Sequence, residues 1–457
     1  MLPTTHEIEL PPIPATANPA LSGPRAPIRA EWTAVGPFAI NGALPPALEG
    51  LLLWLGPNPA VVDDPDHYDP VDGDGMLHGL EIRDGGVAWA GSRLVVTGQL
   101  YNRLGGKAPS GPLSAAGPVA NAALALVAGR LVALDGRGLG YRISTELSTI
   151  MVEDFDSMLS SPMGSQVETD PTTGTAIFLG LDMFGPPFLR YHEVTRDGLF
   201  AFSDPIPFGP PGAEPALGVT ATTLAIVESS IRGQLDGEGD LLDGARMLDL
   251  ANAPAVGLLP RRTPGNEIVW CSSIPSHTSR VLAMADSSEG ALLHVVQALP
   301  QPHDDPSWRP QGRQGHLSRL EVDATARIVR ASVLDDLELD DAAGDVSVAM
   351  DDRRRVYAVT ADGRVLVKYD ITDGTRERRE LDAGQLASRP IFLRDPDGRS
   401  DEEGWVVCVL LDTPSMISSI LVLDATRFTG RPEALIRMPQ RVPIDLTAIF
   451  ISAQQLR

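Results

Sequence analysis

Cysteine and aromatic residues are scarce in this chain, and no long apolar run interrupts it. Its 457 residues include two cysteines, and Phe, Trp and Tyr together make up 5%. The two cysteines, Cys271 and Cys408, can form neither a disulfide framework nor a zinc site, and their apolar contexts predict small core residues. No apolar run approaches the roughly 18 residues of a membrane span, and no basic segment leads into an apolar run at the N-terminus. These absences predict a cytoplasmic protein without a transmembrane segment or signal peptide.

Positive charge is also in short supply. Lys and Arg total 37 against 60 Asp and Glu, which gives a net charge of −23. Such an excess of negative charge argues against nucleic acid and against anionic membrane surfaces as partners, because both would repel it. The acidic residues are dispersed through turn-like segments, which is typical of a solvated surface.

What the sequence does contain is a series of short apolar runs bounded by Gly, Asp, Pro and Ser. Runs of this length between turn residues are typical of strands, so the sequence predicts an all-β fold. No internal repeat is sharp enough to count structural units. The runs lie at residues 50–54, 129–134, 176–179, 224–227, 291–296, 355–359, 405–411 and 420–423.

Two segments lie outside this pattern. Residues 1–30 are rich in Pro and Ala and are predicted to form an extended N-terminal arm, followed by a single domain over residues 31–457. Residues 113–124 are predicted to be an irregular or short helical insertion.

The most informative stretch is Leu-Gly-Pro-Asn-Pro at 55–59, followed by Tyr-Asp-Pro-Val-Asp-Gly-Asp-Gly-Met-Leu-His-Gly-Leu at 68–80. Residues 72–75 predict a turn in which Gly73 and Gly75 supply positive φ and the aspartates bond nearby backbone. The residues from Met76 to Ile82 then predict a strand.

This stretch resembles the N-terminal signature of the carotenoid oxygenase family. Further matches follow in the same order along most of the chain, and that order makes the set specific although each match alone is weak. The resemblance implies a seven-bladed β-propeller with a cap of loops and short helices over an axial tunnel. The further matches lie at residues 44–50, 121–134, 170–174, 419–425 and 438–443.

The family holds an iron ion with four histidines, and three of those positions differ in this chain. Position by position, the resemblance places Gln166, Ala216, His277 and Thr447 at the four ligand sites. An amide, a hydroxyl and a methyl group cannot replace three imidazoles around ferrous iron. The family's outer glutamates orient its histidines, and one of them maps near Asp135 and Gly136, where no Glu stands. The iron cofactor is therefore expected to be absent, unless histidines elsewhere rebuild a site.

Two residues are candidates for proton transfer in place of the metal. His277 would lie on the propeller axis beside the tunnel, or it is a buried histidine with a structural role. Asp445 stands where the family has Gly, and beside an apolar tunnel its pKa would be raised. Alternatively, Asp445 is an outward-facing turn residue. Gln166, Ala216 and Thr447 would contact substrate or fill the emptied metal position.

Three functions follow from the resemblance. The first is an iron-independent isomerase, cyclase or lyase acting on a polyene, terpenoid or other extended apolar substrate. The second is a non-catalytic binder of an apolar ligand. The third is an iron(II) dioxygenase that cleaves a conjugated double bond. Other catalytic signatures are absent, since the chain contains no G-x-S-x-G, P-loop, H-E-x-x-H or helix-opening G-x-G-x-x-G motif. The sequence leaves the oligomeric state and the substrate's identity open.

Overall fold

Strands make up nearly all regular structure of the protein. The structure is a computed structural model, and it describes residues 4–103, 119–182, 186–209, 213–235, 241–248, 254–299 and 314–456. Within those ranges the only α-helix is α1 (Gly98–Arg103), and six short 3-10 helices join strands. No helix in the described part of the chain is long and apolar enough to cross a membrane. The all-β prediction is thus confirmed.

The chain divides into two compact units. Unit 1 comprises Met1–Ser160, Asp362–Lys368 and Glu377–Arg457, and unit 2 comprises Ser161–Ala361 and Tyr369–Arg376. The single domain expected over residues 31–457 stays a prediction.

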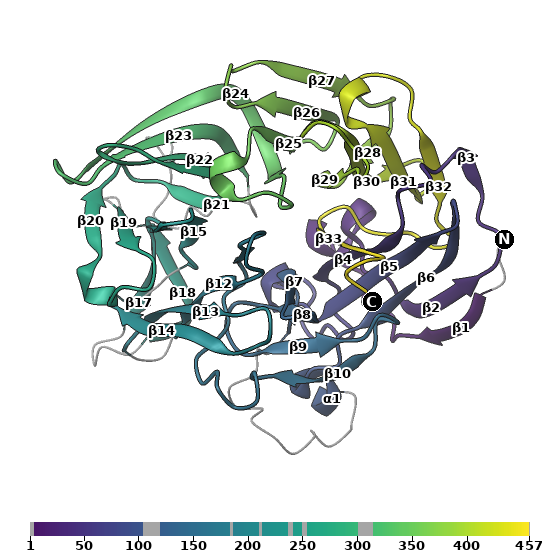
Figure 1. The fold of residues 1–457 in the computed structure, drawn as a ribbon. Helices are drawn as coiled ribbons and strands as arrows, with labels where there is room; N and C mark the ends of the chain where they lie inside the picture. The colour runs from purple at the N-terminus through teal and green to yellow at the C-terminus, as the bar shows by residue number, and fades with distance from the viewer. Residues whose placement is uncertain are drawn as a thin grey trace. The chain divides into compact units, whose positions relative to one another are not determined.

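Unit 1 contains three antiparallel sheets (Figure 1). The first has the order β1 (Thr4–Glu9), β2 (Ala30–Val35), β6 (Gly86–Leu94), β5 (Gly75–Arg83), β4 (Gly50–Pro57), β33 (Thr447–Ser452). The second has the order β10 (Thr149–Glu153), β9 (Gly140–Ile143), β8 (Arg130–Leu134), β7 (Ala123–Val127). The third has the order β28 (Gln385–Ala387), β30 (Gly404–Asp412), β31 (Ile417–Asp424), β32 (Ala434–Arg437), β3 (Ile40–Gly42), with β29 (Ile391–Arg394) also on β30. Its 3-10 helices are Pro19–Leu21, Gly23–Arg25, Pro70–Asp72 and Ala425–Arg427.

Unit 2 follows the same antiparallel pattern. One sheet runs β11 (Val167–Thr169), β12 (Ala176–Leu181), β13 (Leu189–Val194), β14 (Phe200–Ile206). The next runs β15 (Ala216–Val219), β16 (Thr223–Val227), β19 (Ala255–Pro260), β20 (Val269–Ser272), and β17 (Ile231–Leu235) pairs separately with β18 (Leu241–Leu248). That sheet continues through a parallel pairing of β20 with β24 (Ile328–Gly344), the exception among the described pairs, into β23 (Gly315–Asp323), β22 (Gly290–Ala298) and β21 (His277–Asp286). Strand β25 (Arg355–Thr360) also pairs with β24. Its 3-10 helices are Gly265–Glu267 and Met350–Asp352. Strands β26 (Val365–Asp370) and β27 (Arg376–Glu380) pair with each other, and the residues of each are divided between the two units.

Every apolar run predicted to be a strand is one. The central strands are buried on both faces, because each sheet packs a core on either side; β30 is buried from Gly404 to Leu411. Alternate residues of β30 separate by face, and Trp405, Val407 and Val409 join one large core cluster. Both cysteines are free and buried, as predicted, and burial raises the pKa of the Cys408 thiol to about 12.

The N-terminal segment contains regular elements. Thr4–Glu9 forms β1 and pairs with β2, and two 3-10 helices follow. The Arg441 guanidinium binds this segment by donating to the carbonyl oxygens of Pro24, at 2.9 Å, and Ala26. Of the insertion expected at residues 113–124, Ala123 and Leu124 begin β7, and residues 113–118 lie outside the described residues.

The glycines of the signature turn are required for space and not for positive φ. Gly73 has a φ of −71°, and Gly75 is absent from the residues with positive φ, so that expectation was wrong. Gly75 instead lies against backbone, since its N–H donates to the Val119 carbonyl at 2.9 Å and a Cβ would overlap the carbonyl oxygen of Ala120. Asp74 is fully buried and its carboxylate accepts from the Ala60 N–H at 2.9 Å.

Replacing Gly75 by alanine is therefore expected to lower the free energy of unfolding by roughly 1–3 kcal/mol, because backbone cannot yield to the added methyl group. Urea unfolding followed by tryptophan fluorescence measures this. Gly209→Ala is the matched control, because no atom lies within 4 Å of a Cβ there and its unfolding should hardly change. Equal unfolding of the two variants would contradict the explanation.

Candidate functional site

The four positions expected to hold metal ligands share one place in the topology. Ala216, His277 and Thr447 are the first residues of β15, β21 and β33, and Gln166 directly precedes β11. Each of these strands lies at an end of its four-strand or longer pairing path, with a single strand neighbour along that path. Gln166, Ala216 and His277 belong to unit 2, and Thr447 belongs to unit 1.

Gln166 and Ala216 lie together in unit 2. The Gln166 side-chain oxygen accepts a hydrogen bond from the Leu217 N–H at 3.3 Å, beside the buried Ala216. Glu214 holds the same segment, since its carboxylate accepts from the Gln166 N–H at 3.2 Å and from the Ser165 hydroxyl at 2.5 Å. The Gln166 amide oxygen thus bonds the backbone of β15.

His277 is half-buried, and Ser229 contacts its ring. The His277 Nδ1 lies 2.9 Å from the Ser229 hydroxyl oxygen, which also accepts from the Ile231 N–H at 3.0 Å. Ser229 is 4% exposed. Sequence reasoning missed Ser229, because it lies 48 residues from His277 and no motif marks it.

One short segment joins the strands that carry these three positions. Arg353 follows the 3-10 helix Met350–Asp352, and its guanidinium donates to Glu168 of β11 at 2.7 Å and to the Leu282 carbonyl of β21 at 3.3 Å. The Met350 sulfur accepts from the Val219 N–H of β15 at 3.3 Å. The starts of β11, β15 and β21 are therefore held by buried contacts a few residues away.

Thr447 occupies the corresponding place in unit 1. Its side chain is buried, and its hydroxyl donates to the Ala122 carbonyl at 2.8 Å. The Ala122 N–H in turn donates to the Leu134 carbonyl at 2.8 Å, next to Asp135. The Thr447 hydroxyl therefore donates its hydrogen bond to the backbone just before β7.

Asp135 is a buried carboxylate at this same end of β8. Its side chain is 1% exposed, and Oδ1 accepts from the Arg137 N–H at 2.9 Å. No described donor hydrogen-bonds to Oδ2, and the Arg137 Nε lies 3.7 Å from it. Asp135 also raises the pKa of Tyr141, whose larger cause is burial. The resemblance implies a glutamate at this position, so the sequence alone did not indicate Asp135 as a candidate site residue.

Asp445 lies on the surface of unit 1. It is exposed, and its carboxylate forms an ion pair with Arg25 of the N-terminal segment. An exposed, ion-paired carboxylate is what the alternative interpretation of Asp445, an outward-facing turn residue, predicts. Its part in catalysis stays a prediction.

Two other histidines are structural. His78 is fully buried with Nδ1 2.7 Å from the Ser92 hydroxyl, and burial, with Arg441 nearby, lowers its pKa to about 3. His192 stacks on Phe178, and burial, with a smaller effect of Arg190, lowers its pKa to about 3. His78 thus has a hydrogen-bonding role and His192 a packing role in the core.

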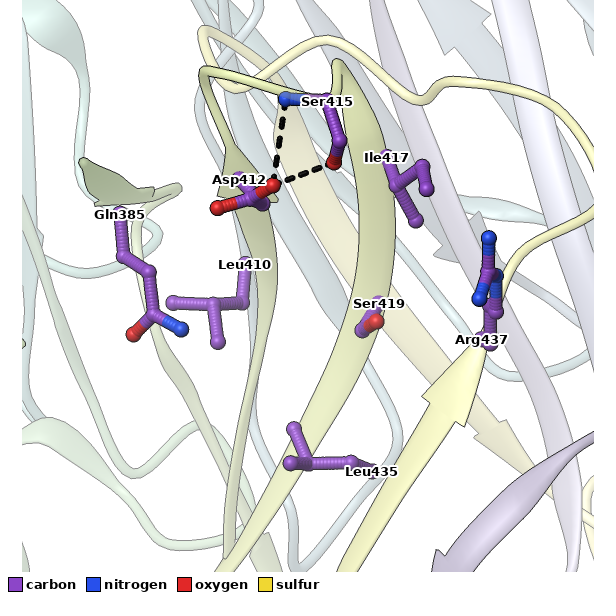
Figure 2. Close-up of a pocket in the computed structure, with 8 residues that line it drawn as sticks. All are labelled: Gln385, Leu410, Asp412, Ser415, Ile417, Ser419, Leu435 and Arg437. Carbon is purple, nitrogen blue, oxygen red and sulfur yellow. Dashed lines mark hydrogen bonds between the residues drawn. The ribbon is translucent and has the colours of Figure 1, made fainter. Parts of the chain in front are cut away.

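A pocket of about 260 Å³ lies elsewhere, on the sheet formed by β28, β30, β31 and β32 (Figure 2). Asp412 at its rim accepts from the Ser415 N–H at 3.2 Å and from the Ser415 hydroxyl. None of the candidate site residues lines it. The lining residues are Gln385, Leu410, Asp412, Ser415, Ile417, Ser419, Leu435 and Arg437.

The side chains at the four strand starts do not fit an iron ion. They provide one imidazole, and the polar atoms of Gln166 and Thr447 bond backbone groups. Ferrous oxygenase sites need several imidazole or carboxylate donors on one metal. Among the described residues, no group of three His, Cys, Asp or Glu side chains is placed to hold a metal ion. His303 lies outside those residues.

Known proteins share this fold over nearly the whole chain. The lignostilbene dioxygenase of Pseudomonas brassicacearum superposes with a TM-score of 0.84 at 20% identity, covering 97% of this chain and 100% of that one. The cobalt-substituted apocarotenoid oxygenase of Synechocystis gives 0.79 at 20% identity, covering 93% and 96%. The fold is therefore a seven-bladed β-propeller, as expected from the sequence.

Sequence relatives lead to the same family. The carotenoid cleavage oxygenase of Mycobacterium tuberculosis is 24% identical, with 93% of this chain and 96% of the relative covered. The probable carotenoid cleavage dioxygenase 4 of Arabidopsis thaliana is 26% identical, with 98% and 83% covered. The family described as retinal pigment epithelial membrane protein matches residues 25–452. The chain belongs to this family of carotenoid oxygenase-like proteins.

Proposed function

We propose that this protein is an enzyme that acts without iron on an extended apolar molecule such as a polyene or terpenoid. The observation that carries the proposal is the donor set at the four strand starts. By the resemblance, Gln166, Ala216 and Thr447 stand where the family has three of its four imidazoles, and His277 keeps the fourth. A chain that keeps the fold and loses the metal donors can keep an apolar substrate and change the reaction. Isomerisation, cyclisation and elimination of a lyase type need proton transfer and shape, and they need no oxidant.

The proposal gives each residue a role. His277 transfers or donates a proton, and Gln166, Ala216 and Thr447 line the substrate space, as their counterparts surround the metal in the family. Asp445 is kept as a second acid–base candidate, to be tested by substitution. Asp135, buried with one oxygen lacking a described donor, is a third candidate for proton transfer.

The names of the relatives favour a second candidate function. The two sequence relatives are named carotenoid cleavage oxygenase and carotenoid cleavage dioxygenase. The corresponding function for this chain is an iron(II) dioxygenase that cleaves a conjugated double bond. It requires metal donors beyond those at the four strand starts. A non-catalytic binder of an apolar ligand is the remaining alternative, and it predicts binding without turnover.

Metal analysis separates these functions. Protein expressed with added iron and then desalted is expected to hold less than about 0.2 equivalents of iron, because one imidazole binds ferrous ion weakly. Near-stoichiometric iron that survives desalting would contradict the iron-independent function and favour the dioxygenase. A panel of polyenes analysed for isomerised, cyclised and cleaved products, with and without a chelator, then separates a metal-free enzyme from a binder.

The matched control restores the imidazoles. A variant with Gln166→His, Ala216→His and Thr447→His is expected to retain iron where the parent chain does not, provided that the four positions line one cavity. Circular dichroism shows whether the variant folds. A folded variant without iron would contradict the shared cavity.

A further inference from the structure

The pocket of about 260 Å³ lies on one face of the sheet formed by β28, β30, β31 and β32, all within unit 1 (Figure 2). Directly paired residues of neighbouring strands share a face, so the strand register groups the lining side chains into rows. The opposite face belongs to a core cluster that includes Val409 and Ile420. The rows are Gln385, Asp412 and Ile417, then Leu410, Ser419 and Arg437, with Leu435 two residues before Arg437 on β32.

Apolar side chains contribute part of the lining. Leu410 is buried, whereas Ile417 and Leu435 are half-buried and keep some of their surface in contact with water. Further along the same face, the paired residues Cys408 and Leu421 are buried. The face is therefore covered in the middle of the sheet and becomes accessible near the β30–β31 hairpin. A ligand with an apolar body would remove this accessible apolar surface from water.

Hydrogen-bond donors lie on the β31–β32 side of the pocket. Arg437 is exposed, and its guanidinium has no acceptor or ion-pair partner in the described part of the chain. Ser419 is paired with Arg437 in the register, and its hydroxyl likewise has no partner among the described residues. A guanidinium beside a hydroxyl suits a carboxylate, because the planar guanidinium can donate two parallel hydrogen bonds to it.

Hydrogen-bond acceptors lie on the β28–β30 side. One oxygen of the Asp412 carboxylate accepts from the Ser415 N–H at 3.2 Å, and the other has no donor within the described ranges. Gln385 is paired with Asp412 across the strands. Its side-chain oxygen accepts from the Asp382 N–H at 3.2 Å and keeps a second lone pair. A carboxylate beside an amide oxygen suits an ammonium group, which can only donate.

The two charged side chains of the pocket leave each other unpaired. Asp412 and Arg437 both lie in the described ranges, and they form no ion pair with each other. They are two strands apart and offset by two residues along the strands, with β31 between them. Strands about 4.8 Å apart and residues about 3.4 Å apart separate their Cα atoms by about 12 Å. A ligand that meets both charges therefore needs an anionic and a cationic end with a spacer between them.

We propose that this pocket binds a small dipolar molecule, a linear amino carboxylate whose carboxylate meets Arg437 and whose ammonium group meets Asp412. The chain's net charge of −23 would repel a simple anion, and a dipolar ligand adds no net charge. The volume of about 260 Å³ is below the roughly 300–1,000 Å³ of pockets for drug-sized ligands, so the site fits a short aliphatic molecule and not an extended polyene. This ligand is distinct from the substrate of the proposed function.

The test uses 6-aminohexanoate, which carries an ammonium group and a carboxylate at the two ends of an aliphatic chain. A titration of the full chain followed by ligand-observed saturation-transfer NMR gives the Kd, and we expect saturable binding in the millimolar range. Hexanoate lacks the ammonium group and hexylamine lacks the carboxylate. Each is expected to bind about 5-fold or more weakly, the equivalent of one exposed charge pair. Hexanoate that binds as tightly as 6-aminohexanoate, or no saturable binding of 6-aminohexanoate, would overturn the proposal.

Substitutions assign the binding to this pocket. Arg437→Gln and Asp412→Asn are each expected to weaken 6-aminohexanoate binding about 5-fold. Asparagine keeps an oxygen that can accept from Ser415. Arg399→Gln and Asp397→Asn are the matched controls, because both residues are exposed, do not line the pocket and undergo the same changes of charge. Controls that weaken binding as much as the pocket variants, or pocket variants with the parental Kd, would overturn the proposal.

The two monopolar analogues separate a lost contact from a damaged fold. Arg437→Gln removes the partner of the carboxylate, so it should weaken hexanoate and leave hexylamine unchanged. Asp412→Asn should do the reverse. A variant that weakens all three molecules alike would contradict the assignment of the two ends. Binding is measured without a polyene, so a protein that binds 6-aminohexanoate as expected and converts no polyene would contradict the proposed function alone.

Discussion

Replacing His277 by alanine is expected to lower turnover by about 10²–10⁴-fold, the usual cost of removing a proton-transfer group. His277 is half-buried at the first position of β21, and its ring is held by Ser229. If the protein acts without iron, as proposed, the imidazole is the proton-transfer group that remains at this position. Initial rates of product formation at saturating polyene measure the loss.

Two comparisons make this result interpretable. The thermal unfolding midpoint of His277→Ala should stay within a few degrees of the parent value, which excludes unfolding as the cause. Asp445→Asn tests the second acid–base candidate, whose carboxylate is exposed and paired with Arg25. A loss as large as in His277→Ala would support an acid–base role for Asp445, and near-parental turnover would support the outward-facing turn residue. If both variants keep full activity, any catalysis comes from holding the substrate in a reactive shape.

Lowering the pH from 7 to 5 is expected to cost roughly 4 kcal/mol of folding free energy through two histidines alone. His78 and His192 are buried, and burial lowers each pKa to about 3 in the folded protein. Their unfolded pKa is about 6.5, so the unfolded chain takes up protons below that pH and the folded protein does not. The stability is fully present above pH 6.5 and declines as the pH falls towards 3.

Urea unfolding at pH 7, 6 and 5 measures this slope. In the double variant His78→Gln with His192→Gln, stability at pH 7 can change, but the decline between pH 7 and 5 should shrink by about 4 kcal/mol. His67→Gln is the control, because His67 is exposed and bonded to exposed Asp64, and its slope should match the parent. Equal slopes in all three proteins would show that the buried rings do take up protons while folded.

Local sequence patterns predicted the strands well, because each strand needs only an apolar run and a turn at either end. The seven-bladed arrangement was predicted from the resemblance alone, because the sequence has no repeat from which the number of blades could be derived. The position of the turn at Asp72–Gly75 was predicted correctly, but the reason for its glycines was not. Gly75 is needed where Ala120 approaches it, and that approach joins segments 45 residues apart, which composition does not reveal.

The candidate site shows the same limit. The sequence order placed Gln166 and Thr447 at metal-ligand positions, but their hydrogen-bond partners come from residues 51 and 325 positions away. Ser229 and Asp135 were missed for the same reason. A serine or aspartate after an apolar strand is common in any β protein. Ser229 is distinguished by its burial and its contact with His277, and Asp135 by a buried oxygen without a described donor.

The pairing of β33 with β4 has a consequence for synthesis in the cell. β4 ends at Pro57, and its neighbour β33 is complete only at Ser452, about 400 residues later. At about 5–20 residues per second, a ribosome needs roughly 20–80 s to cover that interval. Throughout it, an almost fully apolar strand has an unpaired edge, the kind of surface that aggregates or recruits a chaperone. A nascent chain released before Thr447 would therefore carry an open sheet together with an incomplete candidate site, which makes premature termination costly in two ways at once.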